Sequence, residues 1–197
     1  MSPPPAPGGP TGPDLQADPG VIVGYRPARA VADLRLVLGP GARLRSGTVI
    51  YAGSRIGERF ETGHNVVVRE ESTIGDDVQV WSGSVIDYGC RIGHRVKIHT
   101  GCYVAQNSVL EDDVFLAPGV VLANDMYPGR SAEPPLVGPT IRRGAQIGVN
   151  ATLRPGVEVG AGALVGAGAV VVDDVPAGAV VVGNPARPIK DVGDLPA

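Results

Sequence analysis

The sequence is poor in several features that define common protein classes. Its 197 residues contain only two cysteines, Cys90 and Cys102, too few for the disulfide framework of a small secreted domain. Aromatic residues make up 4%, and no apolar run approaches the roughly 20 residues of a membrane-spanning helix. The net charge of -3 provides no positive excess for nucleic acid or anionic lipid. These absences favour a soluble, cytoplasmic protein that binds neither nucleic acid nor membrane.

Glycine and proline are abundant instead, with 29 and 19 residues. This composition is typical of either disorder or a repeat that is dense in turns. Residues 1–20 have few apolar side chains, lack the features of a signal peptide and cannot offset their ordering entropy by burial. We therefore predict a disordered tail over residues 1–20.

From residue 38 onward the chain repeats in sixes. An aliphatic residue opens each of the 21 hexads from Leu38 on, with Thr62 as the exception. The fourth place is Gly, Asn or Asp in 18 of the 21 hexads, and these residue types best tolerate a positive φ. Each hexad is thus expected to be a short strand that ends in a tight turn. The fourth-place exceptions are Arg59, Glu71 and Arg95.

A period of six fits neither the 3.6 residues of an α-helical turn nor the period of two of a long strand. Three short strands with three corners close a triangular coil of 18 residues, and stacked coils pair as parallel strands. The sequence therefore predicts an all-β fold, a parallel β-helix of about seven coils within residues 21–176. Residues 177–197 would cap its end. The repeat stops after Tyr127 and resumes at Ile141, which predicts one protruding loop over residues 128–140.

Several stretches resemble the hexapeptide acyltransferases, notably IGDDVQV, IGHRVKI and the ending DVPAGAVVVGNPAR. The segments TGHNVVVREESTIGDD, VKIHTGCYVAQNSVLEDDVFLAPGVVLANDMYP and GVNATLRPGVEVGAGA are most similar to N-acyltransferases of nucleotide-linked amino sugars. The resemblance covers roughly residues 38–190. It implies a left-handed β-helix, a homotrimer with active sites between subunits, and acetyl-CoA as co-substrate with no bound cofactor or metal. The implied acceptor is the amine of a dTDP- or UDP-linked deoxysugar.

Acyl transfer to an amine requires a proton acceptor and hydrogen-bond donors for the developing oxyanion. Histidine is suited to take that proton near neutral pH. His99 is the predicted base because IHTGC resembles a family motif and lies one coil below the coil that runs into the loop. His64, in TGHN, is the second candidate, and the 18-residue stacking places both on one corner. His94 lies on another corner. Either candidate can instead be an exposed corner residue or pack on Trp81, and the amine can also lose its proton to water or to the thiolate.

The corner just before the loop carries Asn124 and Asp125, which match the family's Asn-Asp-x-Tyr-Pro sequence. Tyr88 and Gln106 stack in the column of Asn124. The resemblance implies that Asn124 and Asp125 bind the substrate, although Asn-Asp is also ordinary turn chemistry. Tyr88 and Gln106 are predicted to bind it as well, as the column neighbours of Asn124. This corner of one chain would meet the corner of His99 in a neighbouring chain.

For CoA, the resemblance points to the upper coils. Backbone amides at corners can bind the pantetheine arm, and arginines can pair with phosphates or simply be solvated. The predicted CoA-binding residues are Gly148, Asn150, Ala151, Arg154, Gly166 and Arg187. Cys90 and Cys102 occupy the inward-facing fifth place of their hexads and are predicted to fill the core.

Three other functions remain open. An O-acetyltransferase that acts on a hydroxyl shares the fold and the C-terminal sequence. A γ-type carbonic anhydrase holds zinc with three histidines, but His64 and His94 are 30 residues apart, which is not a multiple of 18. A non-enzymatic β-helix scaffold is disfavoured by the interrupting loop and by the CoA-binding ending that the resemblance implies.

Overall fold

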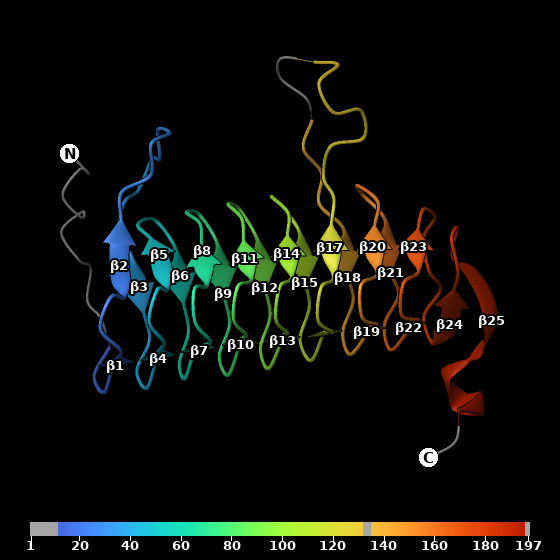
Figure 1. Cartoon of the computed structure of the whole chain (residues 1–197), viewed down its shortest axis with the longest axis horizontal. Helices are drawn as coiled ribbons and strands as arrows, with labels where there is room; N and C mark the ends of the chain where they lie inside the picture. The colour runs from blue at the N-terminus through green and yellow to red at the C-terminus, as the bar shows by residue number, and fades with distance from the viewer. Residues whose placement is uncertain (1–11, 132–134, 196–197) are drawn as a thin grey trace.

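The chain forms a three-sided parallel β-helix in a computed structural model that describes residues 12–131 and 135–195 (Figure 1). Almost every strand is two residues long and is followed by a tight turn. The strands that face the viewer in Figure 1 point upward while the coils advance from the N-terminal to the C-terminal end, so the winding is left-handed. The predicted fold class is confirmed. One of its three sheets has eight strands, so the β-helix has about eight turns rather than the predicted seven.

Each face of the prism is one sheet, and successive strands of a sheet pair with the next coil. Sheet A contains β3 (Val37–Leu38), β6 (Arg55–Ile56), β9 (Thr73–Ile74), β12 (Arg91–Ile92), β15 (Val109–Leu110), β18 (Thr140–Ile141) and β21 (Glu158–Val159). Sheet C contains β2 (Ile22–Tyr25), β5 (Val49–Tyr51), β8 (Val67–Val68), β11 (Val85–Ile86), β14 (Tyr103–Val104), β17 (Val121–Leu122), β20 (Thr152–Leu153) and β23 (Val170–Val171).

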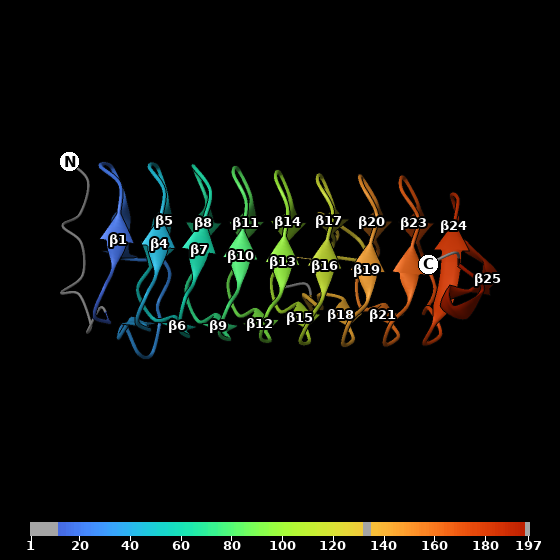
Figure 2. The ribbon, with the colours of Figure 1, turned by 90° about the horizontal axis from the view of Figure 1, so that it is seen from below.

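Sheet B faces the viewer in Figure 2 and is the longest of the three, with ten strands. Its members are β1 (Gln16–Ala17), β4 (Arg43–Leu44), β7 (Glu61–Thr62), β10 (Gln79–Val80), β13 (Lys97–Ile98), β16 (Phe115–Leu116), β19 (Gln146–Ile147), β22 (Leu164–Val165), β24 (Ala179–Val182) and β25 (Arg187–Asp191). Only β25 is antiparallel to its neighbour, β24. The 3-10 helix η1 (Val192–Asp194) follows it.

The hexad openers form the core, as their spacing requires. Ile86 is paired with Val104 and both have an exposed fraction of 0%. Burial of each such side chain contributes about 2 kcal/mol before the entropy cost. Thr62, the polar opener, is also buried, and its hydroxyl hydrogen-bonds to the hydroxyl of Thr48 at 2.9 Å. The core is therefore a set of stacked aliphatic columns.

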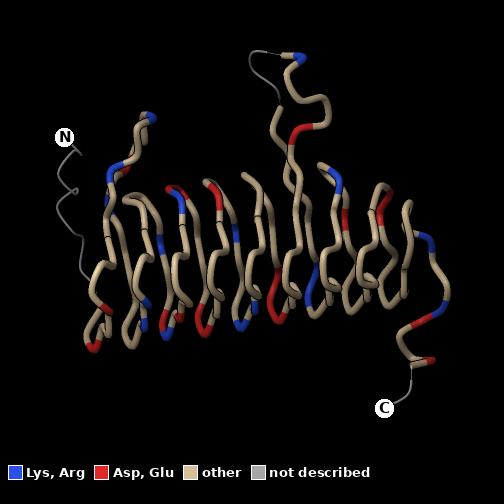
Figure 3. The backbone as a smooth tube through the Cα atoms, viewed as in Figure 1, with Lys and Arg blue, Asp and Glu red and all other residues tan. Residues whose placement is uncertain are grey.

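The corners adopt left-handed backbone conformation even where the residue type opposes it. The fourth place of every hexad has a positive φ except at Asp125 and Asp174. Arg59, Glu71 and Arg95 are included, with φ of 53°, 57° and 56°. Each of these side chains pairs with a charge on another segment, as when Arg95 Nε lies 2.7 Å from Asp113 Oδ1 on the next coil. Figure 3 shows charged residues at many of the turns.

The β-helix begins before the predicted boundary at residue 21. Strand β1 (Gln16–Ala17) lies inside the predicted tail and pairs in parallel with β4. Leu15 explains the difference, because its side chain packs on the core. The proline-rich composition of the segment gave no sign of this buried side chain. Residues 1–11 lie outside the described part, so disorder there stays a prediction.

Two excursions leave the β-helix on the same side (Figure 1). Both depart from the corner where the chain passes from sheet C to sheet A, called here the C–A corner. The first spans residues 26–36, between β2 and β3, and the second is the predicted loop between β17 and β18. The base of the second excursion is closed by a hydrogen bond of 2.9 Å from the Val137 amide to the Asn124 carbonyl. Thr140, the last residue of the predicted loop, already belongs to β18.

None of the described helical turns is long and apolar enough to cross a bilayer.

Candidate active site

His99 lies directly after β13, at the corner where the chain passes from sheet B to sheet C, called the B–C corner (the A–B corner is named in the same way). It is half-buried between two aromatic side chains. Its ring centroid is 5.8 Å from that of Trp81 and 5.0 Å from that of Phe115. The backbone is held as well, since the His99 carbonyl accepts from the Ser84 hydroxyl at 2.7 Å. No hydrogen bond from the described residues engages the imidazole nitrogens. The ring is therefore positioned by packing, and its nitrogens are not engaged by the described residues.

An open pocket of about 160 Å³ lies beside Phe115 on the outer face of sheet B. The predicted CoA-binding residues Gly148 and Gly166 both line it. An added Cβ at Gly148 would lie 2.7 Å from the Val165 carbonyl oxygen, so close packing of the coils also requires this glycine. Because Phe115 also contacts His99, the pocket and the predicted base are adjacent.

The other two histidines are exposed and lie apart from this pocket. His64 shares the B–C corner with His99, as predicted, and its Nδ1 is 2.8 Å from the Ser46 hydroxyl. His94 lies on the A–B corner, where its Nδ1 accepts from the Asp76 amide at 3.0 Å. Only His99 combines partial burial with unengaged ring nitrogens.

The remaining predicted CoA residues do not converge on the pocket. Ala151 is fully buried, so its methyl group cannot contact a ligand. Asn150 occupies a turn position on the B–C corner with φ of 56°. Arg154 lies on the C–A corner and donates to a neighbouring carbonyl, and Arg187 pairs with Asp173 at 3.2 Å. Neither arginine lines the pocket that contains Gly148 and Gly166.

The predicted substrate residues on the C–A corner do come together. The Asn124 Nδ2 donates to Gln106 Oε1, directly below it. Tyr88 lies one coil further down, with its ring 4.2 Å from the Arg29 guanidinium carbon. The Asp125 carboxylate accepts from the Tyr127 amide at 2.9 Å, which is the turn role that its sequence allowed. Asn124 is thus braced by its column, whereas Asp125 shapes the base of the loop.

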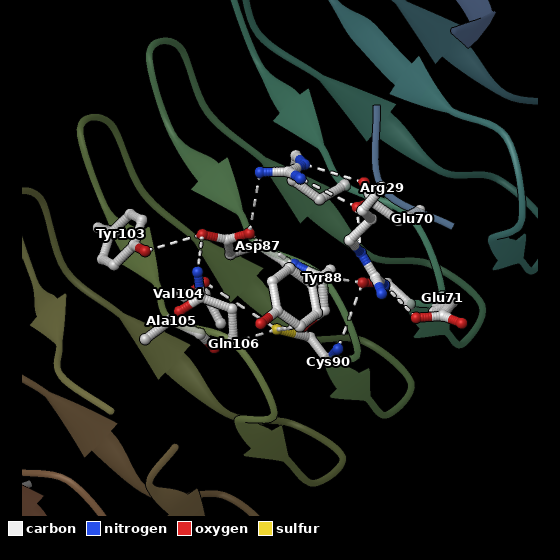
Figure 4. Close-up of polar contacts among 12 residues, drawn as sticks. Arg29, Glu70, Glu71, Asp87, Tyr88, Cys90, Tyr103, Val104, Ala105 and Gln106 are labelled. Carbon is white, nitrogen blue, oxygen red and sulfur yellow. Dashed lines mark hydrogen bonds and ion pairs between the residues drawn. The ribbon is translucent and has the colours of Figure 1, made fainter. Parts of the chain in front are cut away.

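A buried acid that the hexad pattern did not identify supports this column (Figure 4). Asp87 is 6% exposed and accepts from Gln106 Nε2 at 2.7 Å and from Tyr103 Oη at 2.8 Å. Burial, together with the hydrogen bond to Asp87, raises the pKa of Tyr103 to about 12. The 18-residue spacing places Asp87 next to Tyr88 near the C–A corner, so its position could be predicted from the sequence. Its contacts with Gln106 and Tyr103 could not.

The same network continues to the first excursion. Glu70 is fully buried and pairs with Arg69 at 2.9 Å and with Arg29 at 2.6 Å (Figure 4). Burial by itself would raise the pKa of Glu70, but the hydrogen bonds from both guanidinium groups outweigh it and lower that pKa. Arg29 also pairs with Glu71. These ion pairs fasten the 26–36 segment to the C–A corner.

The cysteines belong to the core, as predicted. Cys90 and Cys102 are both buried, and burial raises the pKa of Cys90 to about 12. A thiol held in its neutral form is a poor nucleophile. Among the described residues no cluster of three His, Cys, Asp or Glu side chains has the geometry to hold a metal ion.

Comparison with known proteins places these coils in a family. Residues 89–124 and 138–173 match the family described as "Bacterial transferase hexapeptide (six repeats)". These two stretches therefore carry the hexapeptide repeat of that family. Over 64 residues the chain is 52% identical to 2,3,4,5-tetrahydropyridine-2,6-dicarboxylate N-acetyltransferase of Staphylococcus aureus. That match covers 32% of this chain and 27% of the relative.

Two solved structures are also similar to the chain. PerB of Caulobacter crescentus, in complex with CoA and GDP-perosamine, is 28% identical with a TM-score of 0.46, over 76% of this chain and 57% of that one. The serine acetyltransferase of Neisseria gonorrhoeae is 30% identical with a TM-score of 0.45, over 55% and 40% of the two chains. The matched stretch is thus well under two thirds of each relative.

Proposed function

We propose that this hexapeptide-repeat protein is an acyltransferase that moves an acetyl group from acetyl-CoA to the amine of a dTDP- or UDP-linked amino sugar. The observation that carries the proposal is the His99 imidazole, which has unengaged nitrogens and lies beside the pocket lined by Gly148 and Gly166. The stretch that is 52% identical to an N-acetyltransferase favours nitrogen as the acceptor atom. Both substrates are soluble, so we place the reaction in the cytoplasm.

In this reaction the amine nitrogen attacks the thioester carbonyl carbon. The C–N bond forms, the C–S bond breaks, and the electron pair leaves with the CoA sulfur. His99 takes the proton that the nitrogen loses and can return it to the thiolate, so no covalent enzyme intermediate is needed. Direct attack is consistent with the buried cysteine thiols, which no acyl group can reach.

The roles of the other residues follow from their positions. His64, exposed on the same corner, is the second candidate for proton transfer. On the C–A corner, Asn124, supported by Gln106, would bind the acceptor, with Tyr88 and Asp125 lining the same corner. The pantetheine arm would lie along the open backbone at Gly148 and Gly166. Asn150, Ala151, Arg154 and Arg187 remain the proposed contacts for the rest of CoA, with Ala151 limited to its backbone.

A homotrimer would unite the two corners. The outward side chains of sheet C form a nearly continuous apolar ladder of Ile22, Val49, Val67, Val85, Tyr103, Val121, Thr152 and Val170. Such a face is suited to contact other copies. If three prisms turn sheet C toward a common axis, the B–C corner of each meets the C–A corner of the next. His99 of one chain would then face Asn124 of its neighbour.

The decisive experiment is a thiol-release assay with acetyl-CoA and a panel of acceptors. The panel contains dTDP-, UDP- and GDP-linked amino sugars and the matched sugars that carry a hydroxyl in place of the amine. Release with an amine and not with its hydroxyl match supports the proposal. Release only with hydroxyl acceptors would make the protein an O-acetyltransferase. No release, together with no rise in Tm on addition of acetyl-CoA, would indicate a scaffold.

A further inference from the structure

The carboxylate of Asp87 is surrounded by hydrogen-bond donors on both oxygens. Oδ1 accepts from the Tyr88 backbone N–H at 2.8 Å and faces the Arg69 guanidinium at 3.4 Å. Oδ2 accepts from Tyr103 Oη at 2.8 Å and from Gln106 Nε2 at 2.7 Å (Figure 4). The backbone N–H and the guanidinium can only donate. The position therefore calls for a group that accepts on both sides, which a carboxylate does.

This arrangement dictates the orientation of two amides in sequence. A carboxylate offers no donor, so Gln106 must direct its Nε2 toward Asp87 and its Oε1 away from it. The Oε1 then accepts, so Asn124 must present its Nδ2 to Gln106. The Asn124 Oδ1 is left as an acceptor at the base of the loop, and no hydrogen bond from the described residues occupies it. Orientation is thus transmitted from the buried acid to the exposed amide.

We infer that Asp87 is a positioning residue that acts through Gln106 to turn the oxygen of Asn124 toward the acceptor substrate. The inference rests on the proposed function, because it assigns the acceptor to this corner. An oxygen at this point recognises a group that donates, such as an amine or a sugar hydroxyl, and repels a carboxylate or phosphate. Asp87 would therefore set the specificity for the acceptor without touching it.

The orientation can be reversed by exchanging one acid and one amide. In Asp87→Asn the obligate donors Tyr88 N–H and Arg69 hold the new amide oxygen, so its NH₂ replaces Oδ2 and faces Gln106. Gln106 then turns over, and so does Asn124, which presents NH₂ to the substrate. In Asn124→Asp alone, the new carboxylate opposes the Gln106 oxygen that Asp87 still fixes. In the double variant, the turned Gln106 donates to the new carboxylate, which again presents an oxygen outward.

Steady-state kinetics on the full chain test this prediction. Each single variant should raise the KM for the acceptor about tenfold while the KM for acetyl-CoA is unchanged, since one hydrogen bond to the substrate is lost. The double variant should bind the acceptor more tightly than either single variant. If the two increases in the KM for the acceptor instead multiply, to about a hundredfold in the double variant, the inference is overturned. Asp113→Asn, which breaks an exposed ion pair on the A–B corner, is the control and should leave both KM values unchanged.

A structural readout separates failure of this inference from failure of the proposed function. If the wild-type protein acylates no acceptor, the proposed function fails and the relay can still be measured by the NMR signals of the side-chain amides. Asp87→Asn should shift the amide signals of Gln106 and also those of Asn124, which does not contact Asp87. A shift confined to Gln106 would overturn the relay. Tm values of all variants confirm that each remains folded.

Discussion

His99 and Phe115 pack against each other from adjacent coils, with ring centroids 5.0 Å apart and planes tilted by 52°. Trp81 covers the other side of the imidazole at 5.8 Å. A ring held by two aromatic neighbours loses little freedom on binding a ligand. This contact joins the predicted base to the pocket lined by Gly148 and Gly166.

Removal of the imidazole should cost activity and not stability. We expect His99→Ala to lower kcat/KM for the amine about a hundredfold, the lower range for general base catalysis, with little change in Tm. His94→Ala, an exposed histidine on the A–B corner, is the matched control and should keep full activity. An unchanged kcat/KM in His99→Ala would mean that the proton leaves by another route.

The apolar ladder of sheet C should control assembly. We expect Val85→Glu to convert a trimer into monomers, because three carboxylates would be buried in one interface without partners. Thr73→Glu, on the outer face of sheet A, should leave the trimer intact. Sedimentation equilibrium measures the mass directly. Loss of acetyl transfer should accompany loss of the trimer, and an active Val85→Glu monomer would contradict a site shared between subunits.

The buried ion pairs of Glu70 should make stability depend on pH. The pKa of Glu70 is lower in the folded chain than its ordinary value of 4.5. The ionised carboxylate therefore stabilises the fold above pH 4.5, and this stabilisation is lost as the pH falls through the folded-state pKa. Glu70→Gln should therefore destabilise the protein at neutral pH by about 3 kcal/mol. Urea unfolding at neutral and acidic pH should show the difference from wild type shrinking below pH 4.5.

The matched control for this experiment is Asp77→Asn. Asp77 pairs with Arg59 in a bidentate ion pair at 2.6 and 2.8 Å that is open to solvent. Exposed pairs contribute little because water and salt screen them. The urea midpoint should therefore move much less than in Glu70→Gln. Equal shifts in both variants would show that burial of Glu70 has no special effect.

Tyr103 should titrate well above the ordinary pKa of a tyrosine. Its pKa of about 12 lies above the ordinary value of 10.0, so the neutral phenol stabilises the fold below pH 10.0 and this contribution is lost as the pH rises through about 12. The tyrosinate absorbance of wild-type protein should show a step at that pH, and Tyr103→Phe should lack it. Tyr127→Phe, which alters an exposed tyrosine, should retain the step.

Much of the fold was predictable because its period is strict. Residues 18 apart pair in the sheets, as Ile86 and Val104 do, so corners and columns could be assigned by counting. His99 and Asn124 were placed on their corners in this way. The N-terminal start was not, because Leu15 packs on the core from a segment without the repeat.

The hexad repeat is enough to predict the coil, the inward columns and the corner on which each candidate residue lies, because it specifies Cα positions. Which side chains meet across columns became known from the folded structure alone. Arg29 reaches Glu70 from an excursion that has no period, and Gln106 bonds both to Asn124 in its own column and to Asp87 in the neighbouring one. Side-chain direction depends on burial and hydrogen bonding between neighbouring coils, and a period of six carries no information about either.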